Sequence, residues 1–190
     1  GYNPAGGAGT GFVDADNFNG TAVNTNATQI AFTADLDGDG TIDTVGQDAN
    51  GDGSTDLADM EQIAYRLNGT NLQRYSGSVT GAILWQTVAE HVESIEFQYV
   101  LDDESTTTTP SATQLGRIRN VRVSILVITE NPDTNFTSSR IYLPASNDPF
   151  FTSAADLSGT IWGPFTGTAT ANNRRRLLKT TVNCRNMGLL

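Results

Sequence analysis

One stretch of strongly β-forming residues limits the folds that this chain can adopt. Residues 117–129, "RIRNVRVSILVIT", are dominated by β-branched side chains, which favour extended backbone. Alternate residues of a strand lie on opposite faces of the sheet. One face carries Val121, Val123, Ile125 and Val127, and the other carries Arg122, Ser124, Leu126 and Ile128. The pattern predicts a strand that is covered on one face along its length and on both faces over its far half.

The same alternation recurs in other segments of the chain. It predicts further strands over residues 30–36, 61–67, 72–75, 95–99, 139–144 and 174–186. The turn-forming "NGTN" at 68–71 joins two of these strands into a hairpin. Val88 and Val92 are one helical turn apart, which predicts a short helical turn over 87–92.

The order of the segments indicates which strands are neighbours. Strand 174–186 is expected antiparallel to strand 117–129, and the run Arg174–Arg176 is expected to be its end, with the charged groups in water. Strands 30–36 and 61–67 are expected to lie side by side, because the polar segment between them reads as one bridging loop.

Together these elements predict an α+β fold that is mostly antiparallel β-sheet, with long polar loops and little helix. The length of 190 residues suits a single domain spanning 1–190, with a Gly/Asn-rich entry segment at 1–29 and an Asp-rich loop at 35–59. No apolar run approaches the roughly 18 residues of a membrane span. The opening "GYNPAGGAGTGF" does not have the pattern of a signal peptide.

Charge is distributed very unevenly along the chain. The formal net charge is −10, and the first 110 residues hold 17 of the 21 acidic side chains but only two of the 11 basic ones. Eight of the carboxylates lie between Asp35 and Asp59. Like charges at this density repel one another, so the segment is expected to bind something that neutralises it. An acidic chain of this kind is not expected to bind nucleic acid.

The acidic segment contains two copies of a pattern that suits calcium. The first copy places Asp35, Asp37, Asp39, Thr41 and Asp43 at positions 1, 3, 5, 7 and 9 of a loop, with Gly40 at position 6. The second copy places Asp48, Asn50, Asp52, Ser54, Asp56 and Asp59 at positions 1, 3, 5, 7, 9 and 12, with Gly53 at position 6. Alternate oxygens of a tight loop converge on one point, and a calcium ion takes six to eight oxygen ligands.

The second copy matches this pattern better than the first. It has a carboxylate, Asp59, at position 12, where the first copy has Gly46 and needs a ligand from elsewhere, such as Asp48 or Asp52. Both one shared ion and two adjacent ions fit the spacing, in a structural role. The alternative is a solvated acidic loop built from turn-forming residues. The short repeat resembles the aspartate-rich calcium repeats of bacterial surface proteins.

The sequence offers little support for an enzyme. His91 is the one histidine and is predicted to be a surface residue, although Glu90 and Glu93 flank it. Cys184, the one cysteine, is predicted to be a small buried apolar residue. "GGAGTG" at 6–11 lacks the strand and helix that a phosphate-binding loop requires. Trp85 and Trp162 are expected to pack in the protein interior.

The ordered set of segments resembles the globular domain of minor pilins. The segments are "GYNP", "FTADLDGDG", "IAYRLNG", "LQR", "VAEHVESIEFQYV", "RIRNVRVSILV" and "RRRLLKTTVNCRN". In this order they are similar to the PilW-like subunits of type IV pili and to the related minor pseudopilins of type II secretion. The resemblance covers nearly the whole chain.

The resemblance implies a non-enzymatic subunit that acts in assembly initiation at a filament tip and in adhesion. It implies other pilin subunits as partners, and anchoring in the inner membrane through an apolar N-terminal helix that precedes Gly1. It implies an extracellular pilus location or the periplasmic face of the bacterial inner membrane, and it leaves a role in DNA uptake open. Some members of the family carry calcium near this position. The alternative is a free-standing secreted calcium-binding adhesion domain.

Overall fold

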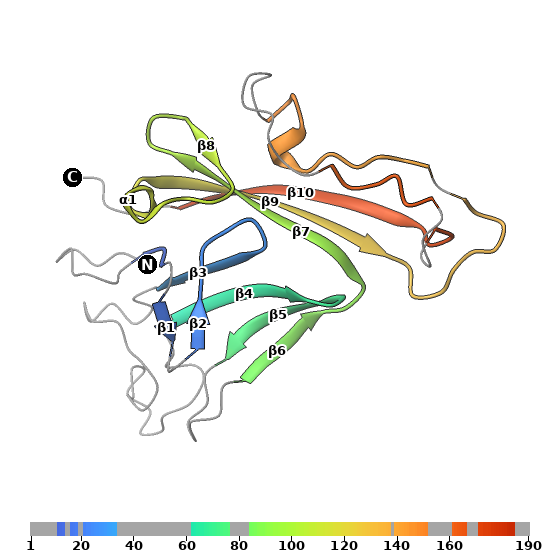
Figure 1. Cartoon of the computed structure of the whole chain (residues 1–190), viewed down its shortest axis with the longest axis horizontal. Helices are drawn as coiled ribbons and strands as arrows, with labels where there is room; N and C mark the ends of the chain where they lie inside the picture. Colours follow the sequence, from blue (N-terminus) through green and yellow to red (C-terminus); the bar gives the residue numbers. More distant parts are fainter. Residues whose placement is uncertain are drawn as a thin grey trace.

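The described part of the chain forms two four-stranded antiparallel sheets and a short two-stranded ribbon (Figure 1). The computed structural model describes residues 11–13, 16–18, 21–33, 62–76, 84–137, 139–151, 161–166 and 171–184. The ribbon pairs β1 (Asp16–Phe18) with β2 (Thr21–Val23).

The first sheet has the strand order β3-β4-β5-β6 and is built from neighbours in the sequence. Its strands are β3 (Gln29–Thr33), β4 (Gln62–Asn68), β5 (Asn71–Ser76) and β6 (Leu84–Ala89). The predicted hairpin is confirmed, because β4 and β5 pair across the turn at Gly69, whose φ is 61°. The predicted neighbours 30–36 and 61–67 are confirmed by the pairing of β3 with β4.

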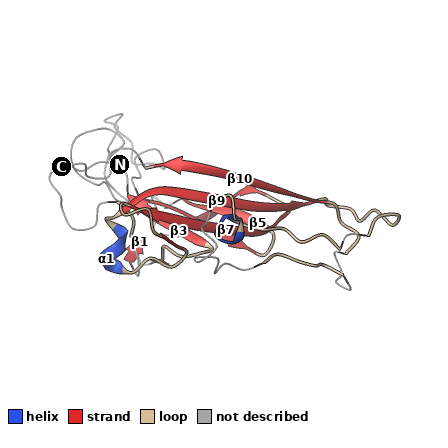
Figure 2. Ribbon diagram, turned by 90° about the horizontal axis from the view of Figure 1, so that it is seen from above, coloured by secondary structure: helices blue, strands red, loops and turns tan. Residues whose placement is uncertain are grey.

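The second sheet has the order β10-β9-β7-β8 and contains the longest strands. Its strands are β7 (Val92–Leu101), β8 (Thr106–Thr107), β9 (Ile118–Ile128) and β10 (Arg175–Asn183). The predicted antiparallel pairing of 117–129 with 174–186 is confirmed by β9 and β10. In Figure 2, β10 lies along the outside of this sheet.

The α+β prediction is wrong, because the described chain is almost entirely antiparallel β-structure. Its helical elements are the four-residue α1 (Ala112–Leu115) and the 3-10 turn η2 (Ala145–Asn147). The predicted helical turn over 87–92 is replaced by the end of β6 and the start of β7. The spacing of Val88 and Val92 was misleading because the two valines belong to different sheets. Val88 is 51% exposed, whereas Val92 is buried in the second sheet.

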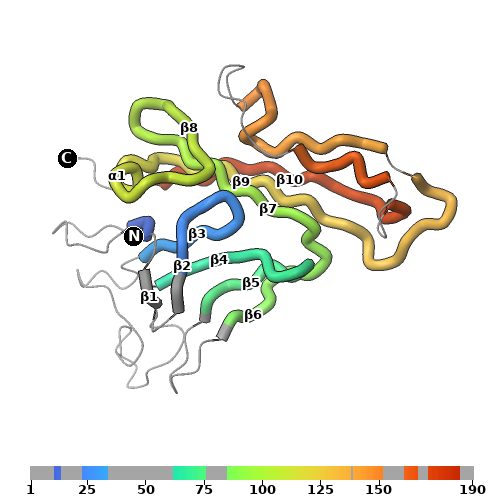
Figure 3. The backbone as a smooth tube through the Cα atoms, viewed as in Figure 1, coloured from blue at the N-terminus to red at the C-terminus, as the bar shows by residue number. Residues whose placement is uncertain are grey.

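The chain passes from β6 of the first sheet to β7 of the second (Figure 3). The corner between these two strands lies at His91. His91 has a φ of 58°, the left-handed region that few side chains favour. The next N–H, on Val92, donates to the carbonyl of Thr70 in the first sheet at 2.9 Å. The carbonyl of His91 accepts from the N–H of Ile128 in β9, also at 2.9 Å. The corner is therefore bonded to both sheets.

The main core lies between the two sheets. Phe12, Ile30, Ile95, Phe97, Tyr99, Leu101, Ile118 and Val121 form one buried cluster. Backbone contacts reinforce it, because the N–H of Phe97 donates to the carbonyl of Ala27 at 2.8 Å and the Tyr99 hydroxyl donates to the carbonyl of Asn26 at 2.9 Å. Apolar burial and hydrogen bonds thus join β7 to the turn before β3.

The opposite face of the second sheet is covered by the segment that contains η2. Ser124 and Leu126 are fully buried there, which confirms that the far half of β9 is covered on both faces. Leu126 packs with Tyr142 and Trp162. The predicted strand 139–144 is wrong as a regular strand, since it contributes one isolated bridge between Tyr142 and Trp162.

This second interface also contains a buried carboxylate. The backbone N–H and the hydroxyl of Ser146 donate to the two oxygens of Glu96, at 3.1 and 2.7 Å. Burial raises the pKa of Glu96, and the two hydrogen bonds from Ser146 oppose that shift. The covering segment is therefore hydrogen-bonded to β7 through Glu96, a carboxyl group whose ionised form is disfavoured by burial.

The corner makes a stability prediction. Replacement of His91 by glycine should leave stability unchanged or raise it by about 0.5–1 kcal/mol, because glycine adopts a positive φ without steric cost. Replacement by valine should destabilise the chain by about 1–2 kcal/mol, since a β-branched side chain is strained there. Urea unfolding measures both variants, and equal stability of the two would contradict the role given to the corner.

Glu96 makes a prediction about pH. A raised carboxyl pKa in the folded state gives stability that is present below the unfolded pKa, near 4.3, and is lost as pH rises through the folded value. The variant Glu96→Gln lacks this titration. As pH rises from 4 towards 7, the parent chain should lose stability and the variant should not. The free energy of unfolding of the variant should therefore increase relative to that of the parent chain. Parallel urea titrations at several pH values test this, and a constant difference would show that Glu96 does not titrate as proposed.

Candidate functional site: an apolar groove between the sheets

An apolar depression in the described structure lies between β3 of the first sheet and strands β9 and β10 of the second. Its volume is about 440 Å³. Twelve residues line it: Gly11, Phe12, Ile30, Phe32, Thr33, Tyr65, Phe97, Val121, Val123, Val182, Asn183 and Cys184. Val182 is 51% exposed, so the groove is open to solvent on the β10 side.

The groove exists because the second sheet extends beyond the first. Val121 and Val123 of β9 and Val182 of β10 share one face, as the pairing of Val182 with Val121 shows. The first sheet covers this face over Phe97 and Val121, which are buried. Over β10 the same apolar face has no such cover among the described elements, since Leu178 and Val182 are both substantially exposed.

Two polar groups of the groove, the Thr33 hydroxyl and the Cys184 thiol, are a hydrogen-bonded group and a weak nucleophile. The hydroxyl of Thr33 accepts from the N–H of Gly11 at 2.9 Å, which fixes residues 11–13 beside β3. Burial raises the pKa of the Cys184 thiol, so it stays protonated at neutral pH and is a poor nucleophile. Cys184 is half-buried and packs against the main core, as its alternation with Val182 predicted in part. The groove is therefore suited to bind apolar surface.

His91 forms the corner between the sheets. The neighbouring Glu93 receives two hydrogen bonds from the Arg175 guanidinium, at 2.6 and 2.8 Å, so its carboxylate is committed to that pair. Among the described residues, no three His, Cys, Asp or Glu side chains are grouped closely enough to hold a metal ion.

The arginine run at the start of β10 differs in part from the prediction. Arg174 and Arg176 are exposed, as expected for groups in water. The side chain of Arg175 is completely buried, where it pairs with Glu93 and stacks on Phe165 with 3.8 Å from its guanidinium carbon to the ring centre. Alternation explains this result, because residues 174 and 176 lie on one face of the strand and 175 on the other.

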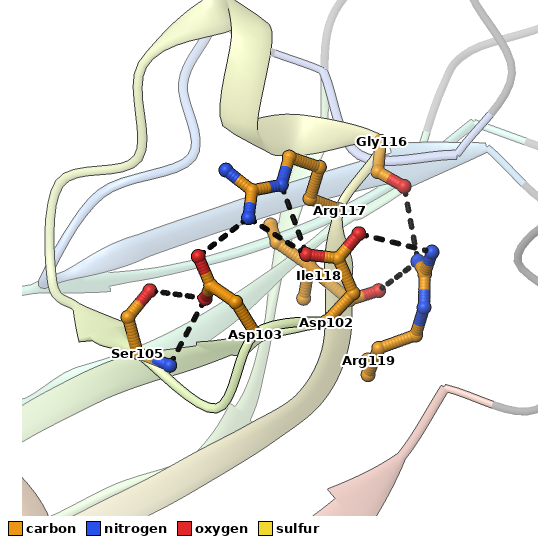
Figure 4. Close-up of polar contacts among 7 residues, drawn as sticks. All are labelled: Asp102, Asp103, Ser105, Gly116, Arg117, Ile118 and Arg119. Atoms are coloured by element: carbon orange, nitrogen blue, oxygen red, sulfur yellow. Dashed lines mark hydrogen bonds and ion pairs between the residues drawn. The ribbon is translucent and has the colours of Figure 1, made fainter.

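A second cluster of charges lies at the opposite end of the second sheet, beside α1 (Figure 4). Arg117 donates to Asp102 at 2.9 Å and to Asp103 at 2.6 Å. Hydrogen bonds from Ser105 and then from Arg117 lower the pKa of Asp103 to about 2. These groups are exposed, and the figure shows them joining the β7–β8 turn to the start of β9. These contacts hold the β7–β8 turn against the start of β9.

The two tryptophans have packing roles. Trp162 is buried with Leu126 and Tyr142 on the covered face of the second sheet. Trp85 is half-buried and packs edge-on against Tyr75, with the guanidinium carbon of Arg66 4.0 Å from its ring centre.

The predicted calcium ligands lie outside the described residues. They are Asp35, Asp37, Asp39, Thr41, Asp43, Asp48, Asn50, Asp52, Ser54, Asp56 and Asp59. The structure does define the two ends of their segment. Thr33, the last residue of β3, pairs directly with Gln62, the first residue of β4. The side-chain oxygen Oε1 of Gln62 is buried and has no hydrogen-bond partner.

Sequence reasoning did not find the groove. The alternation of Val121, Val123 and Val182 predicted apolar strand faces, but it did not show how far the first sheet covers them.

Within the described chain, no helix is long and apolar enough to cross a membrane.

Comparison with known proteins gives structural similarity at a distance and no match by sequence. No protein-family model matches the chain, and no curated protein matches it. Among solved structures, the chain is similar to a type IV-like pilin from Thermus thermophilus, with a TM-score of 0.42 and 15% sequence identity. That similarity covers 84% of this chain and 78% of the pilin chain.

Proposed function

We propose that the chain is the globular part of a minor-pilin-like subunit of an extracellular filament, with a structural and not an enzymatic role. The observation that carries the proposal is the open apolar groove beside β3, β9 and β10. A filament subunit needs apolar surface that stays accessible until assembly covers it. The ordered sequence segments that resemble minor pilins lead to the same class of protein.

The groove fits the partner that this class implies. Its lining is mostly aliphatic and aromatic, its Thr33 hydroxyl is hydrogen-bonded, and its Cys184 thiol stays protonated. An apolar helix, such as the one that pilins contribute to a filament core, offers matching side chains. Burial of this lining contributes roughly 25 cal/mol for each Å² of apolar surface removed from water.

Filament association tests this function directly. Sheared filaments from the producing cells should contain the chain, detected with a specific antibody by immunogold electron microscopy. The variant Val123→Asn, which places a polar group in the groove, should enter filaments several-fold less than the parent chain. Val88→Asn is the matched control, since Val88 is exposed on β6, away from the groove.

Two outcomes would reject this function. The chain could be absent from filaments and present in the medium as a free protein, which would favour a secreted adhesion domain. Alternatively, Val123→Asn and Val88→Asn could enter filaments equally, which would remove the groove from assembly.

We also propose that residues 35–59 bind calcium in a structural role, with one or two ions. The pairing of Thr33 with Gln62 brings the two ends of the acidic segment together, so the loop is already closed at its base. The unpartnered Oε1 of Gln62 supports the proposal, because a side-chain amide oxygen is a calcium ligand of the right type. Each bound calcium ion would offset two of the negative charges of the eight carboxylates between Asp35 and Asp59.

Thermal unfolding tests the calcium proposal. Calcium at a hundredfold excess over its Kd should stabilise the chain by about 2.7 kcal/mol, seen as a rise of several degrees in Tm. Magnesium should have a much smaller effect, because it requires a smaller and more regular coordination shell. Asp52→Ala should abolish the calcium effect. An unchanged Tm with calcium and with excess EGTA would show that the segment is a solvated acidic loop.

A further inference from the structure

Among the described strands, none pairs with the outer edge of β10. Strand β10 pairs with β9 on one side and is the last strand of its sheet. It runs for nine residues, Arg175–Asn183. Exposed edges in natural sheets are usually short or protected by charge or bulges, because a free edge can pair with another chain. A long free edge therefore needs a physical explanation.

The hydrogen-bond pattern shows which backbone groups face outward. The carbonyl of Arg174 accepts from the N–H of Thr129 at 3.0 Å, and the N–H of Cys184 donates to the carbonyl of Arg119 at 2.9 Å. In an antiparallel pair, alternate residues bond to the neighbouring strand. The backbone N–H and C=O groups of even-numbered β10 residues thus bond to β9, and those of odd-numbered residues point away from β9.

The free part of the edge starts at Leu177. The carbonyl of Arg175, which also points away from β9, is 3.4 Å from the Tyr142 hydroxyl and accepts a hydrogen bond from it. From Leu177 to Asn183, no described strand pairs with the outward groups. Lys179 uses its side chain on the opposite face, where it pairs with Asp148.

Two of the exposed side chains of this edge are apolar and lie on the same face of the strand. Leu178 is 43% exposed and Val182 is 51% exposed, and both lie on the face that forms the groove. Thr180 lies midway between them on the same face. A two-fold interface between identical chains uses the same patch on both copies, so that residue i contacts residue j and j contacts i. Two apolar residues at equal distances on either side of Thr180 can meet each other in such an interface.

We propose that β10 pairs antiparallel with β10 of a second copy, about a two-fold axis at Thr180. In this register Leu178 of each copy lies opposite Val182 of the other, and Thr180 lies opposite its own counterpart. The outward groups of Leu177, Lys179, Thr181 and Asn183 then bond across the interface, which joins the two second sheets into one eight-stranded sheet. Cross-strand aliphatic pairs and a Thr–Thr pair are favourable contacts.

The charges of β10 favour the antiparallel arrangement over a parallel one. The run Arg174–Arg176 lies at one end of the strand, while residues 180–183 are uncharged. Antiparallel pairing places the two arginine runs at opposite ends of the interface. Parallel pairing would place them side by side, and like charges directly opposite are destabilising. The same antiparallel pairing extends the apolar groove wall, because Val182 belongs to both.

This pairing does not rest on the proposed filament role. A two-fold contact closes on itself and gives a dimer, whereas a filament grows through contacts that do not close. The two surfaces are adjacent but separable, because the groove also uses β3 and β9 while the dimer edge uses β10 alone.

Disulfide trapping tests the register. In the double variant Thr180→Cys with Cys184→Ser, the two introduced thiols should face each other at a non-hydrogen-bonded pair. The Cα atoms of such a pair are about 4.5 Å apart, within the range of a disulfide. Mild oxidation should give a covalent dimer in most molecules. The control Thr181→Cys with Cys184→Ser should give little, because its thiol lies opposite Lys179 of the other copy. Equal trapping of both variants would overturn the register.

Edge-blocking variants test the association itself. The N–H of Thr181 points away from β9, so Thr181→Pro should remove the outward donor and leave the β9 ladder intact. Sedimentation in calcium-containing buffer should show a dimer for the parent chain and for Thr181→Ala. Thr181→Pro should sediment as a monomer with an unchanged circular dichroism spectrum.

A second pair of variants covers the case in which Thr181→Pro fails to fold. Val182→Lys should weaken dimerisation at least tenfold, since it introduces a charge into the apolar pairing. Val88→Lys is the matched control, because Val88 and Val182 are both valines on strands and both 51% exposed. A parent chain that is monomeric at high concentration, or a Val182→Lys variant that dimerises like Val88→Lys, would overturn the proposal.

Discussion

The burial of β7 between two layers holds the described structure together. Phe97 and Tyr99 on one face of β7 pack against the first sheet, while Glu96 on the other face receives the segment around η2. The corner at His91 makes this sandwich arrangement compatible with chain connectivity, because it moves the backbone from one sheet to the other within two residues. The groove and the free edge of β10 both follow from how far each layer extends over the second sheet.

The groove and the free edge of β10 lie where the neighbouring layers no longer cover the second sheet. The first sheet covers β7 and part of β9, and the η2 segment covers the opposite face. On the groove side, β10 lies beyond the reach of the first sheet, so its even-numbered residues present Leu178 and Val182 to solvent. Apolar surface of this kind is retained in natural proteins mainly where something binds to it. We propose an apolar helix as the partner of the groove and a strand of a second copy as the partner of the edge.

Sequence reasoning located most strands but misjudged the helical content and parts of the second interface. Residues with strong period-two alternation, such as 117–129, were predicted well because β-branched side chains at that spacing fit a half-buried, pleated surface. The segment around Val88 and Val92 was mispredicted because its spacing also matches a helix, and only the division between two sheets resolves the ambiguity. The burial of Arg175 was missed because its partner, Glu93, is distant in the sequence.

The sequence by itself determined the strand faces, the hairpin at Gly69, the antiparallel pairing of β9 with β10 and the closure of the acidic segment between neighbouring strands. These features depend on local propensity, alternation and turn chemistry, all of which are properties of short segments. Only the tertiary structure decided which apolar faces are covered, which arginine is buried and which strand edge remains free. Those properties depend on how much of one sheet is covered by another layer. Because the layers are formed by segments distant in the sequence, no local pattern encodes that coverage.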